Sequence, residues 1–246
     1  MKKKKVLKIV LIVLLALVGL VVITAGFFAI RGAIMWNDAK EKLPIAKAVE
    51  QLRADADYVK YGDLPQFYID AVVSVEDRRF FKHNGISVKS IVRAALFDLL
   101  SGSFEQGGST ITQQLAKNVW FDQEKRMERK FAEVFAAFSL EKELTKPEIF
   151  ELYVNTIYFG SGYYGIGEAA RGYFGKAPSE LTDYECAILA GLPNAPSSYD
   201  LNVAPELAYQ RMEKVLQAMR DNGKLTEDEV QEVMAQGESG IYETAV

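Results

Sequence analysis

The feature that most limits the fold of this chain is a run of 22 uncharged residues, Ile9–Ile30. As an α-helix with a rise of about 1.5 Å per residue it would be about 33 Å long, which matches the ~30 Å hydrocarbon core of a bilayer. Arg31 ends the run, and five lysines precede it (Lys2, Lys3, Lys4, Lys5 and Lys8). Because cationic flanks favour the cytoplasm, we expect a cytoplasmic tail over residues 1–8, a transmembrane signal anchor over 9–30 and an extracytoplasmic remainder.

A cleaved signal peptide is the alternative interpretation of this run. The apolar part of a signal peptide has about 7–15 residues and ends at a small-residue cleavage site. The run here is longer, and Thr24-Ala25-Gly26 is followed at once by Phe27 and Phe28. We therefore favour an anchor that stays attached.

Composition narrows the functional classes. The chain has 246 residues, of which 49% are hydrophobic, so it can bury a substantial core. Its single cysteine, Cys186, and single histidine, His83, exclude a disulfide framework and histidine-rich metal centres. Without the five N-terminal lysines, 24 basic residues stand against 33 acidic ones, a net charge of −9. This balance argues against a nucleic-acid partner.

The rest of the chain predicts an all-α domain over residues 58–246, joined to the anchor by a helical or irregular stalk over 31–57. No sustained alternation of apolar and polar residues predicts a strand. Helix starts are expected at Pro65, Ser87 and Pro205, and a long amphipathic stretch is expected from about Glu124 to Leu144. Capping boxes are expected at Thr145, Thr182 and Thr226.

Three stretches could carry chemistry. In the first, Glu76 and Asp77 follow an apolar helix, where partial desolvation raises a carboxyl pKa and suits a general base. The second, Gly107–Asn118, places hydroxyls, amides and Lys117 at a helix start that suits a phosphate. The third, Lys125–Glu133, is a basic cluster with Arg129 and Glu133 on one helix face. Each stretch has an ordinary alternative, namely a solvated helix end, simple capping, or surface ion pairs.

Together, a base, a phosphate site and a basic helix outside a membrane suit group transfer from a lipid phosphate or pyrophosphate. At these residues the chain resembles the peptidoglycan glycosyltransferases, family 51 of glycosyltransferases. They occur alone, as monofunctional transglycosylases, and as a domain of class A penicillin-binding proteins. Five motifs occur in the family's order: Glu76–Gly85, Gly108–Gln114, Arg129–Glu133, Glu151–Gly160 and Ala190–Ser197. The resemblance covers roughly residues 58–223.

The resemblance implies a lysozyme-like helical head with a smaller membrane-associated jaw, at about residues 86–106. It implies inverting β-1,4 transfer that polymerises lipid II and releases undecaprenyl pyrophosphate, with Glu76 as general base. Glu133 is implied as the second essential carboxylate, near the pyrophosphate or a divalent metal (Mg²⁺ or Mn²⁺), and no organic cofactor is expected. The residues expected to bind substrate are Asp77, Arg93, Ser109, Thr112, Gln113, Gln114, Lys117, Asn118, Lys125, Arg126, Arg129, Lys130 and Asn155. Either Lys125 or Arg126 would stand where the family has an arginine.

The implied partners are lipid II, the growing glycan strand, the bilayer, and proteins of cell-wall synthesis or division. The implied location is a bacterial plasma membrane, with one span. The apolar stretch Ile91–Leu100 could dip into the bilayer surface or form a core helix. Two other functions are weighed: a lytic, glycan-cleaving enzyme of similar fold, and a non-catalytic cell-wall scaffold. A pyrophosphate site argues against the first, because hydrolysis needs none, and intact Glu76, Glu133 and Lys117 argue against the second.

Overall fold

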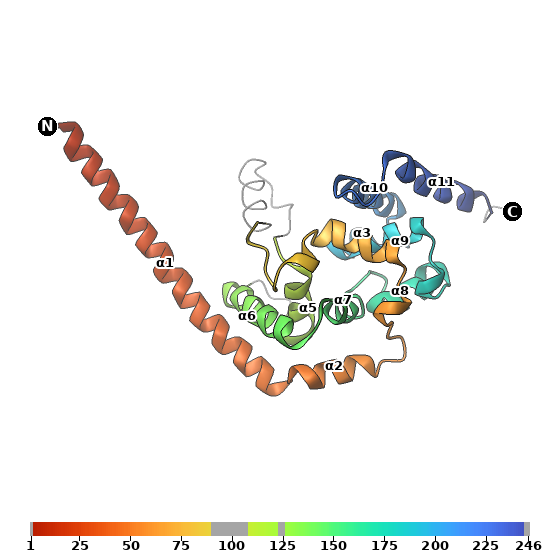
Figure 1. The fold of residues 1–246 in the computed structure, drawn as a ribbon, viewed down its shortest axis with the longest axis horizontal. Coiled ribbons are helices and arrows are strands. Elements are labelled where there is room, and N and C mark those ends of the chain that lie inside the picture. The colour runs from red at the N-terminus through yellow and green to blue at the C-terminus, as the bar shows by residue number, and fades with distance from the viewer. Residues whose placement is uncertain (1, 90–107, 123–125, 244–246) are drawn as a thin grey trace.

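The computed structural model describes residues 2–89, 108–122 and 126–243, and within these ranges the fold is helical with no strand. An antiparallel bridge joins Tyr158 and Tyr164. Figure 1 shows one long N-terminal helix that leans against a compact group of shorter helices. The all-α fold predicted from the sequence is therefore confirmed.

The helices follow one another through short turns. The α-helices are α1 Lys2–Lys42, α2 Ile45–Arg53, α3 Gln66–Glu76, α5 Ile111–Trp120, α6 Met127–Glu143, α7 Lys146–Val154, α8 Gly165–Phe174, α9 Asp183–Gly191, α10 Pro205–Asp221 and α11 Glu227–Glu243. Short 3-10 turns are η1 Tyr61–Asp63, η2 Phe80–Lys82, η3 Pro178–Glu180 and η4 Leu192–Asn194. The expected capping boxes form at the starts of α7 and α9, where Thr145 and Thr182 pair with glutamates three residues later.

The core lies between α3, α5, α7 and α9. Helix α9 packs against α3 and α10, while α5 packs against α6 and α7. Tyr68, Phe80, Phe150 and Phe159 are fully buried among them, and so is Cys186, which burial leaves with a raised pKa. This arrangement fixes the end of α3 beside the start of α5, where two of the candidate motifs meet.

Helix α1 is long and apolar enough to span a membrane, and its apolar part is exposed. Beyond that part it continues without a break and packs on α6. Gly32 allows this approach, since a Cβ there would lie 2.5 Å from Cβ of Phe131. Trp36 is only 4% exposed, donates a hydrogen bond from Nε1 to Ser139 Oγ (3.0 Å) and meets Trp120 edge to face.

Residues 31–57 therefore differ from the stalk expected from the sequence. Ile45 and Ala48 of α2 are also buried in the common core, so most of this segment belongs to the domain. The contacts that bury it join residues about a hundred positions apart, such as Trp36 and Ser139. The helix expected from Ser87 and the jaw expected at about residues 86–106 lie largely outside the described residues.

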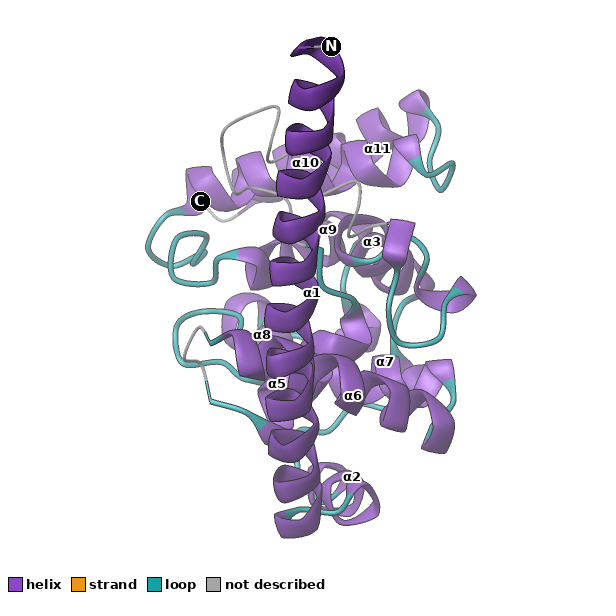
Figure 2. Ribbon diagram, turned by 90° about the vertical axis from the view of Figure 1, so that its left-hand side faces the viewer, coloured by secondary structure: helices purple, strands orange, loops and turns teal. Residues whose placement is uncertain are grey.

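The two ends of the domain differ in their relation to the anchor. Figures 1 and 2 show the N-terminal half of α1 extending away from the domain, whereas α2 lies at the end of the domain farthest from that half. Because the apolar residues of α1 are in that half, the α2 end is the one farther from a membrane that α1 would span.

Candidate active site

A groove runs across the domain where α3, α5, α6 and η4 meet. One part has a volume of about 310 Å³ and is lined by Val75, Glu76, Ser109, Gln114, Lys117, Arg129, Lys130, Glu133, Pro193 and Asn194. An adjoining part of about 490 Å³ shares four of these residues and adds Asn118, Thr156, Ile157, Tyr158, Tyr164 and Pro196. Residues from all five sequence motifs, and Lys117 and Asn118 just after the second, thus meet in one groove.

Glu76, the expected base, is the last residue of α3 and is half-buried at the wall of the groove. Its Oε2 accepts a hydrogen bond of 2.7 Å from Nε2 of Gln114. Oε1 of Gln114 in turn accepts from the hydroxyl of Tyr153 at 3.4 Å. Burial raises the pKa of Tyr153 well above its usual value, and nearby Glu76 adds to the rise, so this hydroxyl stays protonated as a donor. The pair Gln114–Tyr153 fixes the orientation of the Glu76 carboxylate.

Asp77 supports this arrangement from inside the protein. It is 5% exposed, and its Oδ2 lies 2.7 Å from Nε2 of His83 and accepts from the backbone N–H of Ile111 at 3.2 Å. The hydroxyl of Thr110 donates to the carbonyl of Gly85 at 2.6 Å. The loop after Glu76 is therefore tied to the start of α5. Asp77 does not line the groove, so its expected role as a substrate ligand gives way to a positioning one.

The start of α5 also differs from the anion site expected there. The N–H of Ile111 is taken by Asp77, and that of Gln113 donates to Thr110 Oγ1 at 3.2 Å. The side chain of Gln113 is 2% exposed, and its Oε1 accepts a hydrogen bond from the N–H of Thr110. The hydroxyl of Thr112 donates to Glu141 at 2.6 Å. These two side chains do not line the groove. Ser109 and Lys117, in contrast, do line the groove.

Two cations and a buried carboxylate of α6 form the other wall of the groove. Glu133 is only 2% exposed, and its Oε2 lies 2.7 Å from Nζ of Lys130 while its Oε1 lies 3.4 Å from Nε of Arg129. Lys130 also donates to Ser109 Oγ at 2.6 Å, and Arg129 donates from Nη1 to the carbonyl of Asp122 at 2.8 Å. Glu133 thus holds both cations in place along the groove.

Lys117 faces this wall from α5. Burial lowers its pKa; attraction to Glu133 opposes the shift, while repulsion from Arg129 and Lys130 adds to it. The three cations exceed the two carboxylates of this part of the groove, Glu76 and Glu133. An anionic group placed here would compensate the excess charge and favour the protonated form of Lys117.

A metal held by the protein alone does not fit these residues. Within the described ranges, no three or more histidine, cysteine or acidic side chains gather as a ligand set. Glu133, the expected ligand, already carries Arg129 and Lys130 on its two oxygens. Mg²⁺ and Mn²⁺ prefer several oxygen ligands, whereas this wall presents mainly nitrogen cations.

The remaining residues expected to bind substrate do not line the groove or lie outside the described residues. Arg126 lines a separate cavity beside α1 and pairs with Asp122 at 2.5 Å. Asn155 uses its amide to hold the backbone of Val59, accepting at 2.9 Å and donating at 2.8 Å, and does not line the groove. Arg93 and Lys125 lie outside the described residues. The choice between Lys125 and Arg126 therefore stays a prediction.

Asp200 holds a turn beside the groove, a positioning role that the sequence did not predict. It is buried and accepts hydrogen bonds from the N–H (2.6 Å) and hydroxyl (2.8 Å) of Ser161 and from the hydroxyl of Tyr173 (3.3 Å). Burial opposes ionisation, but these bonds and one from the Asn202 N–H keep the pKa of Asp200 below its usual range.

Asp200 closes the turn that carries two aromatic side chains into the groove. Ser161 has a φ of 50°, an uncommon value for a residue with a side chain, between Gly160 and Gly162, whose φ values are also positive. The turn places the ring centroids of Tyr158 and Tyr164 4.8 Å apart. The glycines at positions 160 and 162 favour a turn here, but no local signal links that turn to a carboxylate 39 positions away.

Comparison with known proteins places this site in context. The model of the family described as Transglycosylase matches residues 44–220. A Cupriavidus necator protein that carries the name of a transglycosylase is 44% identical over 201 residues, covering 82% of this chain and 87% of that protein. Penicillin-binding protein 1A of Aquifex aeolicus is 45% identical over 177 residues, or 72% of this chain and 24% of its own.

Two further matches involve longer proteins. Penicillin-binding protein 1F of Bacillus subtilis is 42% identical over 73% of this chain and 25% of its own length. The crystal structure of penicillin-binding protein 1A from Haemophilus influenzae matches with a TM-score of 0.41 and 26% identity, covering 72% of this chain and 17% of that chain. The chain thus spans about a quarter or less of these penicillin-binding proteins.

Proposed function

The chain belongs to the transglycosylase family, the peptidoglycan glycosyltransferases of cell-wall synthesis, and on that premise we propose that it polymerises lipid II. Lipid II carries a disaccharide-pentapeptide on undecaprenyl pyrophosphate, and the product is a β-1,4-linked glycan strand. The observation that carries the proposal is the groove, which sets one oriented carboxylate, Glu76, opposite the cations of Lys117, Arg129 and Lys130. A base and an anion-binding wall are the two groups that this transfer needs.

In the proposed reaction, Glu76 takes the proton of the acceptor sugar hydroxyl. The oxygen forms a bond to the anomeric carbon of the growing strand, and the bond from that carbon to the pyrophosphate breaks. The pyrophosphate leaves with the electron pair, and the configuration at the carbon inverts because no covalent enzyme intermediate forms. Lys117, Lys130 and Arg129 meet the developing negative charge, which is the kind of preorganised stabilisation that lowers such barriers.

Glu133 acts in this scheme by positioning. Its buried carboxylate orients Arg129 and Lys130, and without it two neighbouring cations would repel each other. The divalent metal expected from the resemblance stays a prediction. If Mg²⁺ or Mn²⁺ takes part, substrate phosphates have to supply most of its ligands, and no step above requires it.

The adjoining part of the groove suits the growing glycan. Tyr158 and Tyr164 offer aromatic faces for sugar rings, while Asn118, Thr156 and Asn194 offer groups that can hydrogen-bond hydroxyls. The shared residues Gln114 and Lys117 link this part to the reacting centre. A strand lying here would present its lipid-linked end to Glu76.

The location follows from the anchor. Helix α1 supports a single membrane span, and the lysines that precede it support a cytoplasmic N-terminus with the domain on the outer face of a bacterial plasma membrane. The packing of α1 on α6 would keep the groove close to its lipid-linked substrates. Partners among proteins of cell-wall synthesis or division stay a prediction.

The test is a polymerisation assay with the purified full chain and lipid II, run with divalent metal and with a chelator. We expect glycan polymer and released undecaprenyl pyrophosphate, and we expect Glu76→Gln protein to make neither at a comparable rate. Lipid II left intact under both conditions would refute the proposal. Cleavage of preformed glycan instead of polymerisation would favour the lytic alternative.

A further inference from the structure

A second cationic pocket lies on the other side of α3 from the groove. It has a volume of about 480 Å³, and its walls are the end of α3, η2 and the turn after α10. Its cations are Arg78, Arg79, Lys82, Lys89 and Lys224, and its acids are Asp70 and Asp221. We propose that this pocket, with the exposed apolar side chains beside it, binds the phosphate headgroups of anionic phospholipids in the bilayer.

The charges of the pocket support an anionic ligand. Asp70 is paired with Lys224 at 2.6 Å, and Asp221 with Arg220 at 3.2 Å. Within the described ranges, no carboxylate lies within ion-pair distance of the other four cations (Arg78, Arg79, Lys82 and Lys89). The extracytoplasmic part of the chain is acidic as a whole, so a cluster of four uncompensated cations stands out from its surroundings.

The neighbouring apolar side chains favour a bilayer over a free anion. Phe81 lines the pocket and is 47% exposed, and Val88 beside Lys89 is 64% exposed. Aromatic and basic side chains together are typical of segments that sit at the level of lipid headgroups, with the apolar groups below and the cations on the phosphates. A soluble phosphate would gain nothing from these apolar neighbours.

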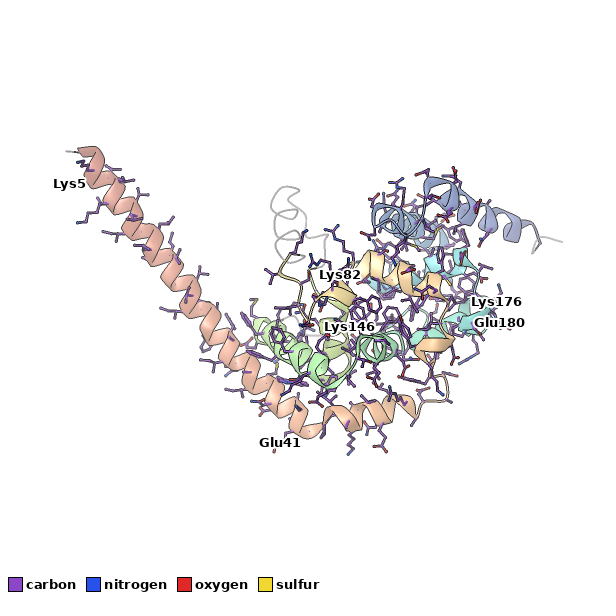
Figure 3. All side chains as sticks on the ribbon, in the orientation of Figure 1. Lys5, Glu41, Lys82, Lys146, Lys176 and Glu180 are labelled. Atoms are coloured by element: carbon purple, nitrogen blue, oxygen red, sulfur yellow. The ribbon has the colours of Figure 1, made fainter. Side chains whose placement is uncertain are left out.

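The position of the pocket points the same way. The apolar half of α1 extends away from the domain, and α2 lies at the end of the domain farthest from it. In Figure 3, Lys82 lies beside α3 and on the anchor's side of Glu41, which marks the far end of α1. A bilayer crossed by α1 would therefore face this pocket.

The pocket is distinct from the groove where substrate pyrophosphate is proposed to bind. Val75 and Glu76 line the groove, whereas Val73 and Ser74 of the same helix line the pocket, and the two cavities share no lining residue. Phospholipid contact here would hold the domain in one orientation on the membrane. The rest of its surface is acidic and would be repelled by an anionic bilayer.

The test uses the full chain in nanodiscs of phosphatidylcholine alone or of equal phosphatidylcholine and phosphatidylglycerol, with amide hydrogen exchange as the readout. Each cation at an anionic surface contributes about fivefold in binding. We therefore expect exchange in residues 77–89 to slow by about fivefold or more with phosphatidylglycerol. The variant Lys82→Gln/Lys89→Gln should lose most of this slowing. The matched control Lys47→Gln/Lys60→Gln, with two exposed lysines remote from the pocket, should keep it.

Three outcomes would overturn the proposal. The first is equal exchange in both lipid compositions, and the second is an equal loss of slowing in the control variant. The third is slowing that appears in phosphatidylcholine only after lipid II is added, which would assign the pocket to substrate pyrophosphate. Because the readout involves no turnover, failure here is separable from failure of the polymerisation assay.

Discussion

Replacing Glu76 with glutamine isolates the proton-accepting role of this side chain. Glutamine has nearly the same shape, and its side-chain oxygen can still accept the 2.7 Å hydrogen bond from Nε2 of Gln114. Gln114 itself remains held by Tyr153. The variant should therefore fold normally and present an amide where the carboxylate was, so that any loss of rate reflects the missing base.

The size of the loss follows from this geometry. General-base catalysis is worth about 10²–10⁴-fold, or about 3–5 kcal/mol of transition-state stabilisation. A second variant, Gln114→Ala, keeps the base but removes its orienting hydrogen bond. Since a hydrogen bond to a charged group contributes about 1.5–3 kcal/mol at most, and water can replace it at a half-exposed carboxylate, we expect a smaller loss of about tenfold.

The assay is initial-rate lipid II polymerisation by wild type, Glu76→Gln and Gln114→Ala, with affinity for a non-reactive pyrophosphate analogue measured in parallel. Analogue binding should be nearly unchanged in Glu76→Gln, because the anion contacts come from Lys117, Arg129 and Lys130. Circular dichroism checks the fold. Near-normal turnover by Glu76→Gln would remove the base assignment and direct attention to Glu133.

Four further predictions follow from single contacts. Trp36→Ala should lower the thermal midpoint in detergent by about 10 °C, because losing a buried tryptophan costs about 3–5 kcal/mol; an unchanged midpoint would make α1 a detached stalk. Analogue affinity should be full while Lys117 is protonated and should fall as pH rises through its lowered pKa, earlier than for an ordinary lysine and not at all in Lys117→Gln. Asp200→Asn should cost about 2 kcal/mol of unfolding free energy by urea titration and weaken glycan binding. Fluorescent penicillin should not label Ser139, whose Ser-x-x-Lys motif lies inside α6 with its hydroxyl donating to the Phe135 carbonyl.

The sequence predicted well those features that depend on neighbours in the chain. Capping boxes join a threonine to a glutamate three positions on, so the starts of α7 and α9 could be predicted from four residues each. The spacing of Arg129 and Glu133 likewise predicted one helix face, and their side chains do meet. In each case the partner is fixed by helix geometry, without knowledge of the tertiary fold.

Features that depend on distant partners could not be predicted. Residues 31–57 carry both apolar and charged side chains, which suits a surface stalk as well as a packed helix. What shows that this segment packs on the domain is the burial of Trp36 against α6, with its hydrogen bond to Ser139. The turn at Ser161 could not be predicted for the same reason, because the carboxylate that closes it belongs to the distant residue Asp200.

The motif residues themselves show why a substrate site is harder to predict than a fold. Polar side chains at motif positions were all expected in the groove, yet Asp77, Thr112 and Asn155 spend their hydrogen bonds on other parts of the protein. A buried polar group is costly unless it is bonded, so each one marks a fixed connection between segments. Here those connections join the loop after Glu76, the start of α5 and the segment before η1. A reacting carboxylate and three mutually repelling cations stay in register only within such a frame, so the same motif must supply both the groups that touch substrate and the groups that hold them.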